Sequence, residues 1–190
     1  MAFFLTSTIY SLSLSLILAA AASASASAAT NRPFSHHYVQ TKPTPTAKKM
    51  TRLHFYFHDI VSGKNPTAMK IIGPKTAFGT TVIIDDPLTK GTKPGSTVVG
   101  RAQGLYALAS QHDSSLLMAI NFVFTYGKYN GSALGVMGLN NVLDAVRELP
   151  VVGGSGAFRF ARGYALTNTV RYNLKTGDAV VQYNVTVMHA

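Results

Sequence analysis

The chain has 190 residues and a formal charge of +10, because 17 Lys and Arg residues outnumber 7 Asp and Glu residues. It contains no cysteine, which excludes a disulfide framework, a thiol nucleophile and a thiolate metal site. The basic residues are scattered, and neither a basic helix nor an aromatic RNA-binding motif occurs, so we expect no nucleic-acid partner.

The first 29 residues carry no charged side chain. An apolar stretch at residues 12–22 precedes the small-residue run SASASAA, which is typical of a cleaved secretory signal with Ala-x-Ala sites. Ser and Thr residues interrupt residues 5–22, whereas a spanning helix needs about 20 predominantly apolar residues. We therefore predict a signal peptide at 1–29 rather than a membrane anchor, and a secreted chain with no membrane span.

Residues 30–50 hold three prolines and no apolar periodicity, so we predict a flexible tail in front of one folded domain at 51–190. Two sequons, at Asn130 and Asn184, predict N-glycosylation of a secreted chain. The positive charge lies entirely after residue 29 and favours an acidic wall polysaccharide as a partner. A generally basic surface accounts for that charge equally well.

Alternating apolar segments recur between turn signals, at 53–60, 78–84, 98–108, 116–126, 132–137, 147–152, 158–170 and 179–187. Asn130-Gly131 predicts a two-residue hairpin turn, and DDPLTKGTKPGS (85–96) and LKTGD read as loops. Residues 139–146 are the one candidate for a helical turn. Eight strands joined locally predict an all-β antiparallel sandwich or up-and-down barrel. An eight-stranded barrel is wide enough for one small ligand.

The first predicted strand ends in a carboxyl group. Leu53, Phe55, Phe57 and Asp59 share one face of a strand over residues 53–60. A carboxylate on an inward apolar face is costly, and burial raises its pKa toward neutrality, where it can act as a general acid or base. Asp59 would otherwise lie past the end of the strand and cap the following turn, and the pattern leaves both interpretations open.

Small residues line one face of the strand at 98–108. Gly100, Ala102, Gly104 and Tyr106 share one parity, so an inward orientation would leave a void beside the Tyr106 phenol. A tight corner of the barrel explains the same spacing equally well. His54 and His58 would lie about 13 Å apart on a strand, too far to share a metal ion. We predict neither a metal site nor a dinucleotide loop.

Five stretches occur in order between residues 53 and 189: FYFHDI, VGRAQGLY, FTYGKYNGS, VRELPVVGGSGAFRFARGYA and DAVVQYNVTVMH. Together they resemble the plant dirigent proteins over the whole predicted domain. The resemblance implies a secreted, eight-stranded antiparallel β-barrel with a central cavity. It also implies a homotrimer in the apoplast, with no cofactor of its own.

The resemblance assigns site residues one at a time. The family's cavity aspartate, tyrosine and arginine match Asp59, Tyr106 and Arg147, which are the implied catalytic residues. Lignan-forming members carry a second aspartate where this chain has Asn140. That departure disfavours pinoresinol-type selectivity and favours the branch near the pterocarpan-forming members. We expect Phe57, Ala102, Gly104 and Asn140 to contact substrate.

Three functions follow from the resemblance. The first is to steer stereoselective coupling of phenoxy radicals that a separate laccase or peroxidase supplies. The second is a dehydratase or cyclase that handles a quinone methide, as in pterocarpan formation from an isoflavanol. The third is a non-catalytic phenol-binding defence protein of the cell wall. In each case the ligand is a phenolic small molecule.

Overall fold

The computed structural model of the protein describes residues 48–73 and 77–190, which contain nine β-strands and two 3₁₀ turns. The strands are β1 (Lys49–Asp59), β2 (Ala68–Ile72), β3 (Thr81–Thr89), β4 (Val98–Leu108), β5 (Ser115–Phe124), β6 (Ala133–Asn141), β7 (Arg147–Ser155), β8 (Arg162–Tyr172) and β9 (Ala179–His189). The predicted signal peptide and most of the predicted tail lie outside the described residues. The last two residues of that tail, Lys49 and Met50, belong to β1.

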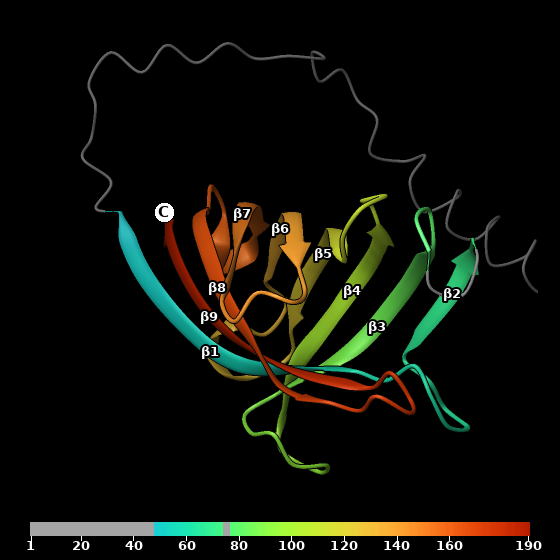
Figure 1. Ribbon diagram of the computed structural model, residues 1–190. Helices are drawn as coiled ribbons and strands as arrows, with labels where there is room; N and C mark the ends of the chain where they lie inside the picture. The colour runs from blue at the N-terminus through green and yellow to red at the C-terminus, as the bar shows by residue number, and fades with distance from the viewer. Residues whose placement is uncertain (1–47, 74–76) are drawn as a thin grey trace, which may run out of the picture. The chain divides into compact units, whose positions relative to one another are not determined.

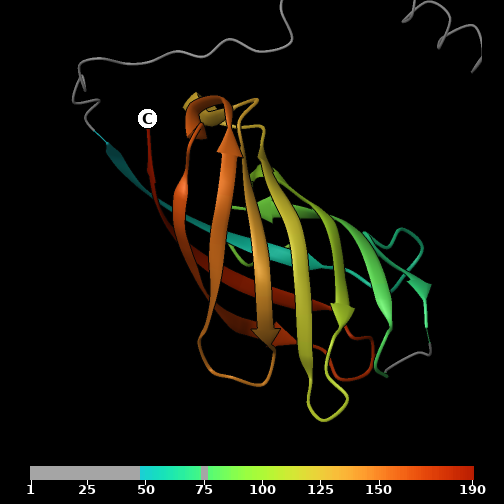
Figure 2. The ribbon, with the colours of Figure 1, turned by 90° about the horizontal axis from the view of Figure 1, so that it is seen from above.

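The strands form a closed antiparallel barrel. The hydrogen-bonded order β1-β9-β8-β7-β6-β5-β4-β3 is completed by a pairing of β3 with β1. β2 pairs only with β3 and lies outside the closed barrel, at the right-hand edge of the sheet in Figure 1. Figure 2 shows the strands from above. The predicted eight-stranded antiparallel barrel is therefore confirmed, with one additional strand.

Some element boundaries differ from the predicted ones. β2 was not predicted, because Ala68 is its only buried residue and its side chains do not alternate in burial. β3 continues through Asp85, Asp86 and Pro87, which were predicted to be a loop. Strand β6 reaches Asn141, so part of the predicted helical turn at 139–146 is a strand.

The turn at Asn130-Gly131 joins β5 to β6, as predicted, but it is not a two-residue hairpin. A 3₁₀ turn at Gly127–Tyr129 precedes it. The Ser132 amide then donates to the Tyr129 carbonyl at 2.9 Å, with Asn130 at φ −52° and ψ 131° and Gly131 at φ +79°. These angles define a type II turn, whose third position favours glycine.

Aromatic side chains fill one end of the barrel and leave the other end open. Phe55 stacks on Tyr183 with ring centroids 5.7 Å apart, and Phe122 meets the same tyrosine edge-on at 5.1 Å. Beyond them, Phe124 and Phe158 pack 5.6 Å apart, at the end where β5 stops. The opposite end, where β1 and β4 stop and β5 and β7 begin, contains a cavity.

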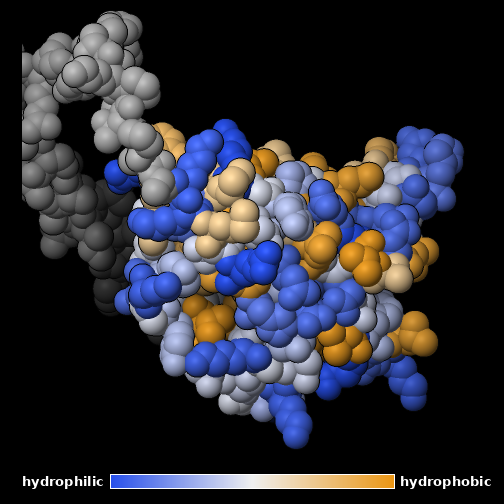
Figure 3. All heavy atoms as spheres, turned by 90° about the vertical axis from the view of Figure 1, so that its left-hand side faces the viewer, coloured by the Kyte–Doolittle hydropathy of each residue, from blue (hydrophilic) through white to orange (hydrophobic). Residues whose placement is uncertain are grey.

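The outer surface is mixed in character. Figure 3 shows one face, on which hydrophilic residues surround smaller hydrophobic groups. Both sequon residues, Asn130 and Asn184, are exposed. The described part of the chain contains no helix with the length and hydrophobicity of a membrane span.

Candidate functional site

A cavity of about 430 Å³ occupies the open end of the barrel. Five of the seven residues predicted to act on or bind substrate line it: Phe57, Asp59, Tyr106, Asn140 and Arg147. They come from β1, β4, β6 and β7, and the closed barrel brings them together although they span 91 positions of sequence. The volume lies within the range of small-molecule pockets.

Asp59 is a partly buried acid that lines the cavity, and it does not cap the following turn. It is the last residue of β1, and the Tyr106 hydroxyl donates a 3.1 Å hydrogen bond to its Oδ2. The amides of Val61 and Ser62, in the turn that Asp59 would have capped, donate instead to Asp178 at 3.0 and 3.1 Å. The alternative interpretation of Asp59 is therefore wrong.

The environment of Asp59 moves its pKa close to neutrality. Burial raises the pKa of this carboxyl to about 6, and the nearby negative charge of Asp178 adds to the increase. The hydrogen bond from Tyr106 opposes the increase because it stabilises the carboxylate. Burial and the charge of Asp59 raise the pKa of Tyr106 itself, so its phenol stays neutral and remains a donor.

Arg147 and Asn140 form a second polar pair in the cavity. The Arg147 Nε donates to Asn140 Oδ1 at 3.1 Å, and its Nη1 donates to the Asp144 carbonyl at 3.3 Å. Only 5% of Arg147 is exposed, and burial lowers its pKa. Within the described residues it has no carboxylate at ion-pair distance. A guanidinium in this setting is suited to an anionic oxygen of a ligand.

Ala102 and Gly104, which were predicted to contact substrate, are not among the residues that line this cavity. The backbone of β5 packs closely against this part of β4: a Cβ on Gly104 would lie 2.2 Å from the Ala119 carbonyl oxygen. Gly104 also has φ +149°, which side chains rarely adopt. Ala102 is fully buried between its β3 and β5 partners. The small residues form a tight corner of the barrel.

The sequence interpretation missed a second acid on the inner face of the barrel, Asp86, and this one is fully buried. It is 0% exposed, and the Thr67 hydroxyl donates to its Oδ1. Burial raises its pKa to about 8, and the charge of Asp59 contributes to that increase. The signal was available in the sequence, because Val82, Ile84, Asp86 and Leu88 alternate on one face as the residues before Asp59 do.

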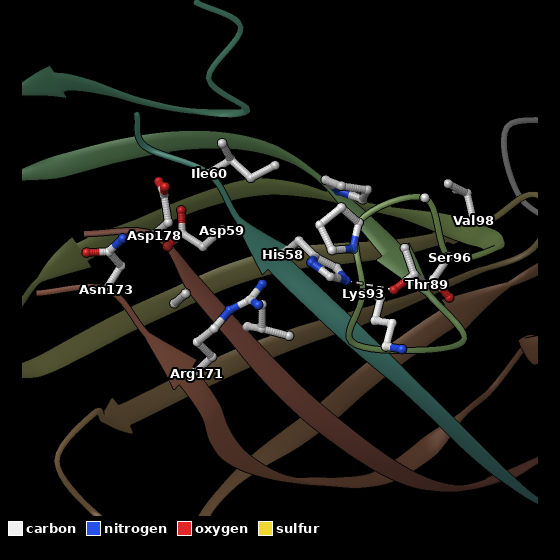
Figure 4. Close-up of a pocket in the computed structure, with 15 residues that line it drawn as sticks. His58, Asp59, Ile60, Thr89, Lys93, Ser96, Val98, Arg171, Asn173 and Asp178 are labelled. Carbon is white, nitrogen blue, oxygen red and sulfur yellow. Dashed lines mark hydrogen bonds between the residues drawn. The ribbon is translucent and has the colours of Figure 1, made fainter. Parts of the chain in front are cut away.

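A larger recess, of about 620 Å³, lies beside the cavity and shares Asp59 and Ala179 with it. Figure 4 shows Asp59 near Asp178 at one side of this recess and His58 near Thr89 at the other. Thr89 gives its hydroxyl proton to the Gly91 carbonyl at 2.7 Å, so the 2.7 Å contact with His58 Nε2 requires that nitrogen to donate. His58 is therefore in the Nε2–H form.

The described residues contain no group of three or more His, Asp or Glu side chains placed to bind a metal ion. The cavity instead offers one carboxyl with a pKa near neutrality, a neutral phenol hydrogen-bonded to that carboxyl, and one buried cation. This set can transfer a proton and stabilise negative charge on a bound oxygen.

Comparison with known proteins identifies the family. The family model for dirigent-like proteins matches residues 50–188. This chain belongs to the dirigent family. It is 53% identical to dirigent protein 21 of Arabidopsis thaliana over 147 residues, covering 74% of this chain and 78% of the relative.

Two further comparisons, one of sequence and one of structure, show similarity between this dirigent chain and pterocarpan synthases. It is 41% identical to pterocarpan synthase 1 of Glycyrrhiza echinata, covering 80% of this chain and 87% of the relative. The solved pterocarpan synthase dirigent protein GePTS1 superimposes with a TM-score of 0.73 at 43% identity, covering 75% of this chain and 86% of that one.

Proposed function

We propose that this dirigent protein binds a phenolic quinone methide in the barrel cavity and directs its closure to one stereoisomer. The observation that carries the proposal is the contact between Tyr106 and Asp59, 3.1 Å apart inside a cavity that also contains the Arg147 guanidinium. Similarity to the pterocarpan synthases supports this choice.

In this reaction Asp59 first donates a proton to the leaving group and later accepts one from the attacking hydroxyl. With a pKa of about 6, a fraction of Asp59 remains protonated near neutral pH and can give its proton to the leaving hydroxyl of an isoflavanol. The C–O bond breaks and water leaves. A second phenolic hydroxyl then attacks the same carbon and returns its proton to Asp59, so the net change is the loss of one water.

Arg147 stabilises the charge that develops during this reaction. Loss of the hydroxyl is assisted when electron density moves in from a phenolate oxygen elsewhere on the ring. A buried guanidinium is suited to hold that oxygen, while Tyr106 keeps Asp59 oriented. Phe57, Leu116 and Met118 provide apolar walls that fix the aromatic rings in one pose.

The second candidate function is to guide phenoxy-radical coupling in the apoplast, with a laccase or peroxidase supplying the radicals. The same apolar walls favour it, because they would hold a flat phenoxy ring as well as a quinone methide. For both functions we also propose that the protein is exported, that Asn130 and Asn184 are N-glycosylated, and that it assembles as a homotrimer.

The test uses purified protein and chiral chromatography in three incubations: an isoflavanol alone, coniferyl alcohol alone, and coniferyl alcohol with laccase. Closure of the isoflavanol to one enantiomer supports the proposal. An enantiomeric excess in the coupling product of coniferyl alcohol, seen only with laccase, supports the radical-coupling function. Racemic product or no product in all three incubations would leave non-catalytic phenol binding as the remaining function. Asp59→Asn should lose selectivity while the exposed control Asp85→Asn keeps it.

A further inference from the structure

Asp86 is a buried titratable group that the proposed reaction does not use. It lies on the inner face of β3 with none of its surface exposed. Thr67 donates a hydrogen bond to one of its oxygens, Oδ1, and the other, Oδ2, has no partner among the described residues. An ionised carboxylate in that position would be severely desolvated, so the neutral acid is favoured.

Asp59 has a matching unpartnered atom. Tyr106 occupies its Oδ2, and its buried Oδ1 accepts no hydrogen bond from the described residues. A protonated carboxyl donates one hydrogen bond, so a single proton on Asp86 Oδ2 would provide partners for both buried oxygens. Two orphaned carboxyl oxygens with complementary needs are unusual inside a barrel.

The strand register brings the two acids toward each other. Only two residue pairs join β1 to β3, Tyr56 with Thr89 and Phe57 with Leu88. Continued by two residues, this antiparallel register sets Asp59 opposite Asp86. Directly opposed residues of an antiparallel pair have Cβ atoms about 5 Å apart. This extended register places the two carboxyls near each other where β1 separates from β3, and the charge of Asp59 acts on Asp86.

We propose that Asp86 is a positioning residue that shares its proton with Asp59 across the seam between β1 and β3, the short stretch where these two strands pair. The two carboxyls then take up and release protons as one unit. The proposal deepens the proposed function and rests on it for its catalytic meaning. The shared proton orients Asp59, and it provides a reserve proton beside the acid that acts on the ligand.

The surrounding groups set the order of the two titrations. Burial and Asp178 act on Asp59, whose pKa is about 6. Once Asp59 is ionised, its charge helps to hold the Asp86 proton to about pH 8. On the outer face Arg101 and Asp85 act on Asp86 with opposite signs.

His58 lies on the outer side of the same β1–β3 junction, where burial lowers its pKa below the usual value. The other ionisable groups on this side of the barrel carry no competing proton near neutral pH. Tyr106 from β4 is a neutral phenol, and so is the fully buried Tyr183 from β9. Arg147 from β7 keeps its charge and acts on Tyr183. The two carboxyls are therefore the groups of this cluster that titrate between about pH 6 and pH 8.

The test is a side-chain carboxyl NMR titration of the free protein with ¹³C-labelled aspartate, which needs no substrate. The chain has six aspartates, so single Asp→Asn variants assign the resonances. We expect the Asp59 and Asp86 signals each to report both transitions. In Asp86→Asn the Asp59 signal should show one transition. Asp86→Ala, which lacks a donor, should raise the Asp59 midpoint by about one unit.

A control and a second readout keep the two proposals distinguishable. Asp85→Asn, one residue away on the exposed face, should leave the Asp59 titration unchanged. If Asp86→Asn also leaves its shape and midpoint unchanged, proton sharing is refuted, whatever the activity is. If the Asp59 and Asp86 signals are coupled but no ligand is turned over, proton sharing is supported and the proposed function is refuted. In an active protein, Asp86→Asn should remove the change in rate near pH 8.

Discussion

Replacing Asp86 with asparagine should stabilise the barrel, and the gain should depend on pH. The pKa of Asp86 is raised from 3.8 to about 8 in the folded protein. Between these values the unfolded chain has released its proton while the folded protein still holds it, so the stability of the native protein falls as pH rises. Asparagine carries no charge in either state and removes this dependence.

The size of the effect follows from the pKa difference. Each unit corresponds to about 1.4 kcal/mol, so a gap of about three units at pH 7 sets an upper limit of about 4 kcal/mol. Losing the proton shared with Asp59 subtracts about 1 kcal/mol. The amide oxygen that the substitution introduces still accepts a hydrogen bond from Thr67. We expect a net gain of about 1–3 kcal/mol at pH 7 and none at about pH 4.

Urea unfolding of both proteins at about pH 4, 5.5, 7 and 8 measures this difference. Asp85→Asn is the control: its carboxylate pairs with Arg101 on the surface and has a lowered pKa, so its removal should destabilise slightly, by less than about 1 kcal/mol at neutral pH. A stability difference between Asp86→Asn and the original protein that stays constant from pH 4 to pH 8 would refute the reasoning.

Three further predictions test the site. Gly104→Ala should destabilise the barrel by about 2–4 kcal/mol in urea unfolding, because the new Cβ would meet the β5 backbone. Gly153→Ala, whose Cβ would have nothing within 4 Å, should change stability by less than about 1 kcal/mol. Equal effects of the two substitutions would contradict the close contact of β4 with β5. Tyr106→Phe removes a donor that stabilises the Asp59 carboxylate, so the Asp59 midpoint should move above its value of about 6 in the NMR titration, and a lower midpoint would count against this contact. Arg147→Gln should reduce turnover at least about tenfold in the chromatographic assay with little change in fold, and full turnover would remove Arg147 from the mechanism.

The sequence predicted what depends on alternation. Asp59 was found because it continues an apolar face, and the barrel followed from the recurrence of such faces. Asp86 continues an apolar face in the same way, but Asp-Asp-Pro has the composition of a turn. The segment was therefore predicted to be a loop, although its alternating pattern indicates a strand. Tertiary pairing with β4 holds these residues in a strand.

Spacing alone could not distinguish a void from a close contact. Gly100, Ala102 and Gly104 leave room on one face of a strand, and only the backbone position of β5 shows that a neighbouring carbonyl takes that room. The places of Arg147 and Asn140 in the site came from family resemblance alone, because neither stands out in its local pattern. Their pairing at 3.1 Å needed the fold.

The seam between β1 and β3 is the shortest ladder in the closed barrel, with two residue pairs against eleven between β1 and β9. The chemistry of the cavity is therefore placed beside the part of the wall that has the fewest paired residues. His58 and Thr89 join this seam from the outside, without entering the cavity. Substitutions of His58 or Thr89 would alter the water content around Asp59, and so its affinity for protons, without contacting a ligand in the cavity.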